Sequence, residues 1–139
     1  VEATGHIDNQ TDSTITVETV EFAVTEETEP EDVDTFDDLT SFSFASVEGR
    51  TTSDGTFDAL YIEAIEDEDA RYALEGELES FSTADSTLTL LGVQVGVTDE
   101  TEFDDDLTFD GLQVGSPYEV EFTRDADDNR IATEVETGV

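Results

Sequence analysis

The sequence contains few side chains that could do chemistry, and the most suggestive spacing among them is that of a calcium loop. The stretch DADDNRIATEVE places Asp125, Asp127 and Asn129 at positions 1, 3 and 5 of an EF-hand-like loop. Position 6 of such a loop calls for glycine and is Arg130 here, and the following IATEVE alternates like a strand rather than a helix. We therefore favour a polar hairpin turn, with a looser Ca²⁺ site at Asp125, Asp127 and Asn129 as the alternative.

Candidates for catalysis are weaker still. The one histidine, His6, lies in a strand-like pattern, where a lone histidine is usually packed or solvent-facing, and no spacing fixes a serine and a carboxylate beside it. Carboxylates occur throughout the chain, so a pair of them says nothing about glycosidic chemistry. No glycine-rich phosphate loop occurs. We predict that the chain is not an enzyme, has no catalytic residues and requires no cofactor, with Ca²⁺ as the open alternative.

Two other polar motifs are predicted to lie in surface turns. Asn9-Gln10-Thr11 fits the acceptor pattern for N-glycosylation, which makes Asn9 a candidate for modification. The run Asp104 to Asp106 is a second carboxylate cluster, which we interpret as a solvated turn.

The charge composition excludes several classes of partner. The chain has 39 acidic residues, four arginines and no lysine, which gives a formal net charge of −35. Nucleic acids and anionic membrane surfaces need a basic face, so neither is an expected partner. No apolar run reaches the roughly 20 residues of a membrane helix, so membrane insertion is not expected. The acidic excess is typical of proteins from salt-loving or marine organisms, since salt screens such self-repulsion.

The chain repeats itself at an offset of 73 residues. Over residues 12–63 and 85–136, 21 of the 52 aligned pairs are identical, among them DSTITV with DSTLTL, VTEETE with VTDETE and TFDDL with TFDGL. Gly5 matches Gly76 after a two-residue shift that the first turn absorbs. We predict two homologous repeats, 1–66 and 72–139, joined by an acidic segment, 67–71.

Each repeat reads as a series of short strands. Apolar residues alternate with polar ones in the runs around 14–17, 20–24, 87–90 and 93–97, and strands are also predicted at 42–48, 57–65, 118–122 and 131–135. This alternation argues against the disorder that low hydrophobicity and high charge would otherwise suggest. A short helix is the alternative for EDEDARYALEGELES. The predicted fold class is all-β: two tandem small antiparallel barrels or sandwiches, similar to OB folds.

The second repeat resembles the DUF5666 family of bacterial exported proteins. The run TLTLLGVQVGVTDETEF, followed by LTFDGLQVGSPYEVEF and NRIATEVE, carries the pattern of that family at these positions: Gly92, Thr101, Phe103, Leu112, Gly115, Val120, Ala132 and Thr133. The first repeat departs from it, with Thr19 in place of Gly92 and Phe42 in place of Gly115, so its turns are expected to differ. The resemblance implies a small β-barrel, often repeated, with no assigned catalytic residues.

These features lead to an expectation about function. We expect a non-enzymatic structural or interaction protein that is extracellular or on the cell surface, although the chain contains no signal peptide. Without lysine or cysteine, self-association into a filament or other homo-oligomer has to be noncovalent, for instance by the strand-like ends VEATGHI and IATEVETGV completing a neighbour's sheet. The alternative is a soluble module of a halophilic or marine microbe that binds carbohydrate or depends on Ca²⁺.

Overall fold

The protein consists of two compact units of β-structure. A computed structural model describes residues 1–31, 42–104 and 106–138, and the chain divides into the units Val1–Tyr72 and Ala73–Val139. The helix that was the alternative for residues 66–80 does not form. Only a short 3₁₀ turn, η2 (Asp67–Asp69), occurs there, and the chain then enters a long strand. No helix in the described ranges has the length and apolarity to cross a membrane.

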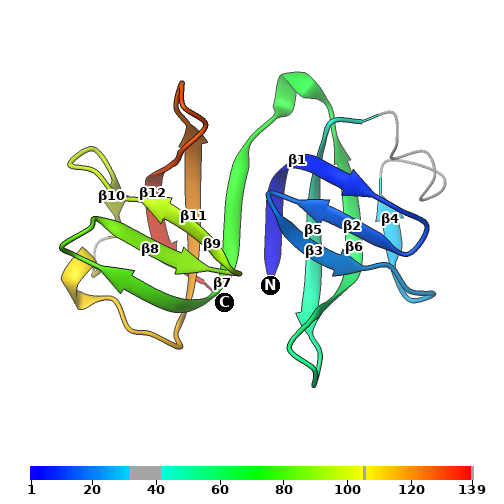
Figure 1. Cartoon of the computed structure of the whole chain (residues 1–139), viewed down its shortest axis with the longest axis horizontal. Helices are drawn as coiled ribbons and strands as arrows, with labels where there is room; N and C mark the ends of the chain where they lie inside the picture. Colours follow the sequence, from blue (N-terminus) through cyan, green and yellow to red (C-terminus); the bar gives the residue numbers. More distant parts are fainter. Residues whose placement is uncertain (32–41, 105, 139) are drawn as a thin grey trace. The chain divides into compact units, whose positions relative to one another are not determined.

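Unit 1 is a small barrel with OB-like strand order (Figure 1). The first strand pairs antiparallel with the second and with the fifth, the second with the third, and the fifth with the sixth. The third and fourth strands then run parallel to the sixth, which closes the ring. The strands are β1 (Glu2–Gln10), β2 (Thr14–Val17), β3 (Val20–Ala23), β4 (Glu29–Glu31), β5 (Phe44–Thr51) and β6 (Phe57–Ile65).

Unit 2 repeats the same barrel strand for strand. Its β8 pairs with β7 and β9, β11 with β12, and β9 and β10 run parallel to β12. The strands are β7 (Tyr72–Ser82), β8 (Thr87–Leu90), β9 (Val93–Gly96), β10 (Glu102–Phe103), β11 (Pro117–Arg124) and β12 (Arg130–Thr137), with a 3₁₀ turn, η3 (Phe109–Gly111), between β10 and β11.

The registers of the two barrels match at the offset of 73 that the sequence shows. Ala23 pairs with Asp58 in unit 1, and Gly96 pairs with Ile131 in unit 2. The first strands instead match at an offset of 71, with Ile7 opposite Val17 and Leu78 opposite Leu90. The turn from β7 to β8 is therefore two residues longer than the turn from β1 to β2. The predicted all-β fold and its two tandem repeats are confirmed.

The core of each barrel is built from the inward members of the alternating runs. Ile15, Val17 and Phe22 are fully buried in unit 1, and their counterparts Leu88, Leu90 and Val95 fill the same positions in unit 2. Burial of such side chains contributes about 1.5–3 kcal/mol each. The period of two thus decides which face of every strand is covered.

The expectation that the turn at Thr19 differs from the turn at Gly92 is wrong, whereas the difference expected between Phe42 and Gly115 is present, because only Gly115 has a positive φ, of 93°. Glu18 and Thr19, between β2 and β3, have φ of 50° and 66°, and their counterparts Leu91 and Gly92 have 53° and 74°. Both hairpins therefore have left-handed backbone at both central residues, as in type I′ turns. Thr19 is held there because its N–H donates to Oδ2 of Asp8 at 2.7 Å and the Glu18 side chain is fully buried.

The buried Glu18 carboxylate depends on a glycine. Its Oε2 accepts the N–H of His6 at 2.9 Å. A Cβ on Gly5 would lie 2.4 Å from Cγ of Glu18, so only glycine leaves space for this side chain. Tertiary packing thus outweighs the local backbone penalty at the turn.

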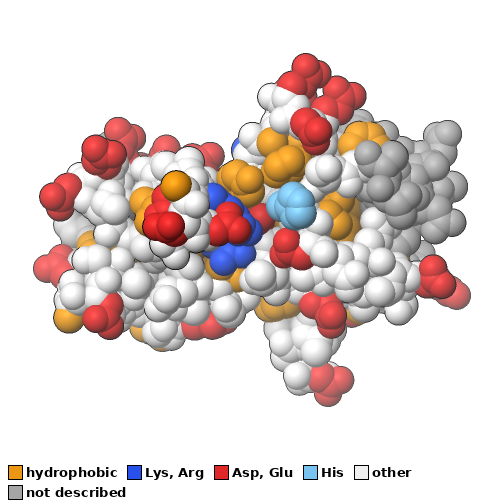
Figure 2. Space-filling model, turned by 45° about the horizontal axis from the view of Figure 1, so that its top comes forward, with side chains coloured by type: hydrophobic (Ala, Val, Ile, Leu, Met, Phe, Trp, Pro, Cys, Tyr) orange, Lys and Arg blue, Asp and Glu red, His pale blue; other side chains and the backbone are white. Residues whose placement is uncertain are grey.

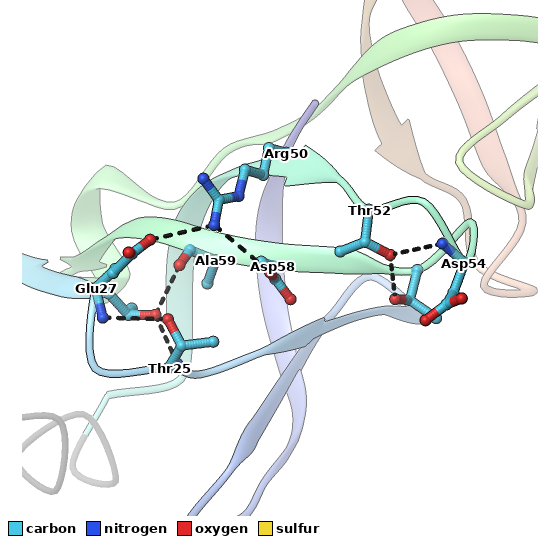
Figure 3. A network of polar contacts seen from close by, with 9 residues as sticks. Thr25, Glu27, Arg50, Thr52, Asp54, Asp58 and Ala59 are labelled. Carbon is cyan, nitrogen blue, oxygen red and sulfur yellow. Dashed lines mark hydrogen bonds and ion pairs between the residues drawn. The ribbon is translucent and has the colours of Figure 1, made fainter.

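The repeated phrase VTEETE and VTDETE forms a threonine latch, defined here as Thr25 and Thr28 in unit 1 and as Thr98 and Thr101 in unit 2. Figure 3 shows the region of the unit 1 latch, with Thr25 and Ala59 labelled. Oγ1 of Thr28 donates to the carbonyl of Ala59 at 2.6 Å and accepts the N–H of Thr25 at 2.9 Å. In unit 2, Oγ1 of Thr101 makes the same two bonds, at 2.7 and 3.0 Å. The latch ties the turn after the third strand to the last strand of each barrel.

Candidate functional site

The strongest candidate site is a groove on the outer face of β8 and β9 in unit 2. These are the second and third strands of the barrel, and the turns β7–β8 and β11–β12 stand at its sides. In OB folds the same strands and the corresponding loops form the ligand-binding face. The groove has a volume of about 370 Å³, which is within the range of small-ligand sites.

The lining of this groove is polar and nearly free of carboxylates. The β7–β8 turn supplies Asp85 and Ser86, the outward positions of β8 and β9 supply Thr87, Gln94 and Gly96, and the remaining residues are Val97, Thr98, Asn129, Arg130 and Ile131. Hydroxyl and amide groups both donate and accept hydrogen bonds, so they can match a ligand that does the same. The one carboxylate, Asp85, is balanced by the one guanidinium, Arg130.

The floor of the groove is shaped by a glycine on β9. A Cβ on Gly96 would lie 3.3 Å from Cδ1 of Ile131 and 3.4 Å from the carbonyl oxygen of Arg130. A larger residue here would crowd β12 and fill the groove from below. The absence of a side chain at Gly96 therefore keeps the floor low and exposes the side of Ile131.

The corresponding face of unit 1 has different chemistry. The counterparts of Asp85, Gln94 and Ile131 are Asp12, Glu21 and Asp58, so three carboxylates stand where unit 2 has one. Of these three, Asp58 lies 3.9 Å from the guanidinium of Arg50 on β5, which also lies 3.1 Å from the carboxylate of Glu27 (Figure 3). The two repeats have kept one backbone and diverged at this surface.

A second feature of unit 2 is a row of glutamates on β10, β11 and β12. The hydrogen bond and charge of Glu136, together with Glu121 and Glu102, raise the pKa of Glu134 to about 7. Burial and a hydrogen bond with Glu75 raise the pKa of Glu119. Figure 2 shows that acidic side chains are nevertheless scattered over the visible face rather than gathered in one patch.

The predicted calcium residues lie together in the β11–β12 turn. The Asp125 carboxylate accepts the N–H groups of Asp127 and Asn129, both at 2.9 Å, and these bonds lower its pKa. Its oxygens thus serve as acceptors for the turn's own N–H groups. Within the described residues, no group of three or more histidine, cysteine or acidic side chains is arranged to hold a metal ion. A Ca²⁺ site here stays a prediction.

The other residues singled out from the sequence lie apart from the groove. His6 is exposed, packs edge-on against Phe44 and lies 3.3 Å from Oδ1 of Asp8. Asn9 is exposed near the end of β1, opposite Thr16, and its glycosylation stays a prediction. In the predicted acidic run, the N–H of Asp104 donates to the carbonyl of Val135 at 3.0 Å. Asp105 and the stretch TFDDL at 35–39 lie outside the described residues.

A family model described as a domain of unknown function, DUF5666, matches the chain twice, over residues 4–63 and 75–136. The chain belongs to the DUF5666 family. Each match lies within one barrel, which confirms the tandem repeat of DUF5666 units that the sequence motifs indicated. No curated protein and no solved structure matches the chain.

Sequence reasoning missed the groove of the second DUF5666 repeat. Gln94 carried no motif, and the adjacent residues Asn129 and Arg130 were considered only as positions of a calcium loop. Only the barrel brings Gln94 of β9 next to these two residues. A position-by-position comparison of the two repeats contained the signal. In unit 2, Gln94 and Ile131 occupy the positions of Glu21 and Asp58 in unit 1, and the first turn of unit 2 is two residues longer.

Proposed function

We propose that this protein is a non-enzymatic interaction module that binds a partner through the groove of unit 2. The observation that carries the proposal is the position of the groove, on the second and third strands between the two turns that serve ligand binding in OB barrels. Its polar lining supplies hydroxyl and amide groups that can hydrogen-bond a partner. An extracellular or cell-surface location is part of the proposal and follows from the resemblance of the repeats to a family of exported bacterial proteins.

The proposal is tested by binding measurements on the full chain with a matched pair of arginine variants. Arg130→Ala removes a groove side chain, and Arg50→Ala removes the same charge from unit 1. We expect ligands recovered from a panel of neutral saccharides, uronate oligomers and peptides to lose affinity only in Arg130→Ala. Equal loss in both variants, or binding that neither variant changes, would contradict a role for the groove.

Self-association is a separate proposal, and the terminal strands offer it little support. Both terminal strands are already paired along their length within their own barrels. In β1, residues 2–6 pair with β5 and residues 7–10 with β2, and β12 pairs with β11 from end to end. Strand donation to a neighbour would first have to break this pairing. Light scattering and electron microscopy at high salt, with Ca²⁺ and then with chelator, test the proposal. A monodisperse monomer throughout contradicts it.

A further inference from the structure

We propose that the groove of unit 2 takes a neutral polyhydroxyl ligand, a segment of an uncharged saccharide. This inference rests on the proposed function and adds the class of ligand. Its first basis is the set of hydrogen-bonding groups in the lining. Ser86, Thr87 and Thr98 supply hydroxyls, and Gln94 and Asn129 supply amides. Each of these groups can donate and accept, as can each hydroxyl of a sugar.

The second basis is the local balance of charge. Among the residues that line the groove, the carboxylate of Asp85 and the guanidinium of Arg130 give a formal charge of zero, in a chain whose net charge is −35. An anionic ligand would meet the repulsion of the whole molecule at this surface. A cation would be attracted more strongly to the face of unit 1 that carries Asp12, Glu21 and Asp58. The groove is therefore suited to an uncharged ligand.

The third basis is shape. Asp85 and Ser86, at the end of the β7–β8 turn, provide one wall, and the two residues by which this turn exceeds its counterpart in unit 1 precede them. Gly96 and Ile131 give the floor a small apolar strip, on which the C–H face of a sugar ring can lie while its hydroxyls meet the polar walls. The lining contains no aromatic ring for stacking, so we expect a dissociation constant on the order of 1 mM.

The test is a titration of the isotopically labelled full chain with maltohexaose and cellohexaose, followed by the backbone amide resonances. We expect saturable shifts at the groove residues and none at the counterpart face of unit 1. The double variant Gln94→Glu with Ile131→Asp gives unit 2 the carboxylates of unit 1, and we expect it to weaken binding about tenfold or more. Gln113→Glu, at an exposed residue outside the groove lining, is the control for added charge and should bind like the parent.

The possible outcomes separate the ligand class from the proposed function. Groove shifts caused by a galacturonate hexamer or a peptide, but by neither neutral saccharide, overturn the ligand class and leave the interaction module standing. If no compound in the panel moves the groove resonances, both proposals fall. Shifts from a neutral saccharide that the double variant leaves unchanged also overturn the inference. Unaltered resonances elsewhere in the double variant show that it is folded.

Discussion

The two β-hairpin turns at Thr19 and Gly92 provide a test in which each barrel is the control for the other. Thr19 has φ of 66°, and Gly92 has φ of 74°. Left-handed backbone costs about 1–2 kcal/mol for a residue with a Cβ, and the greater freedom of glycine in the unfolded chain offsets about 0.5–1 kcal/mol of that difference. We therefore expect Thr19→Gly to raise the free energy of unfolding of unit 1 by about 1 kcal/mol.

The reverse change should have the opposite sign in unit 2. A Cβ on Gly92 would meet no atom within 4 Å, so Gly92→Thr adds backbone strain without a clash and should lower the free energy of unfolding by about 1 kcal/mol. The hydrogen bonds from the N–H of Thr19 to Asp8, at 2.7 Å, and from the N–H of Gly92 to Glu79, at 3.1 Å, use backbone donors and survive both substitutions.

The assay must resolve the two barrels within one chain. Hydrogen exchange of backbone amides in moderate urea at high salt reports the opening free energy of each unit separately. In a thermal scan, 1 kcal/mol corresponds to about 4–8 °C in a domain of this size. If Thr19→Gly leaves unit 1 unchanged or less stable, then Thr19 is not held in left-handed backbone and the reasoning is refuted. The turns of the two repeats would then differ, as the sequence alone suggested.

Three further predictions concern stability. Thr101→Val removes the hydroxyl of the threonine latch and should lower the free energy of unfolding of unit 2 by about 1–3 kcal/mol. Thr28→Val should do the same in unit 1, and unequal losses would show that the latches are not equivalent. Gly5→Ala should cost about 1–3 kcal/mol through its clash with Glu18, and should cost less in a Glu18→Ala background; equal costs in both backgrounds would exclude the clash. Because the pKa of Glu134 is raised from 4.5 to about 7, the folded state binds more protons between these values, and its stability should fall as pH rises through this window. The measurement is the urea midpoint of unfolding as a function of pH, and we expect its fall between pH 4.5 and 7 to be smaller in Glu134→Gln than in the parent. A difference in midpoint between parent and variant that stays constant with pH would contradict the raised pKa of Glu134.

The predicted strands depend on local pattern, and their success has a simple physical reason. The run from 87 to 90 alternates strictly, and β8 spans Thr87–Leu90 as expected. Alternation places every second side chain on one face, so the apolar members of this run, Leu88 and Leu90, are the ones that face the core. The offset of 73 residues then relates the strand register of one barrel to that of the other.

The candidate site could not be predicted in the same way. Gln94 lies on β9, whereas the adjacent residues Asn129 and Arg130 lie where the β11–β12 turn enters β12, and closure of the barrel determines that all three line one groove. The turn at Glu18 and Thr19 was misjudged for a related reason. Its left-handed backbone is unfavourable locally and is stabilised by Asp8 and by burial of Glu18, both of which are tertiary contacts.

The sequence by itself determined the fold class, the duplication and the family, because these depend on periodicity and on residues compared along the chain. The tertiary structure decided where the surfaces of the two copies differ in charge and shape. Ring closure aligned the lengthened first turn, the neutral Gln94 and the bare Gly96 of unit 2 on one surface. The charge and shape of a surface follow from which distant segments meet there, and no local pattern in the chain records that meeting.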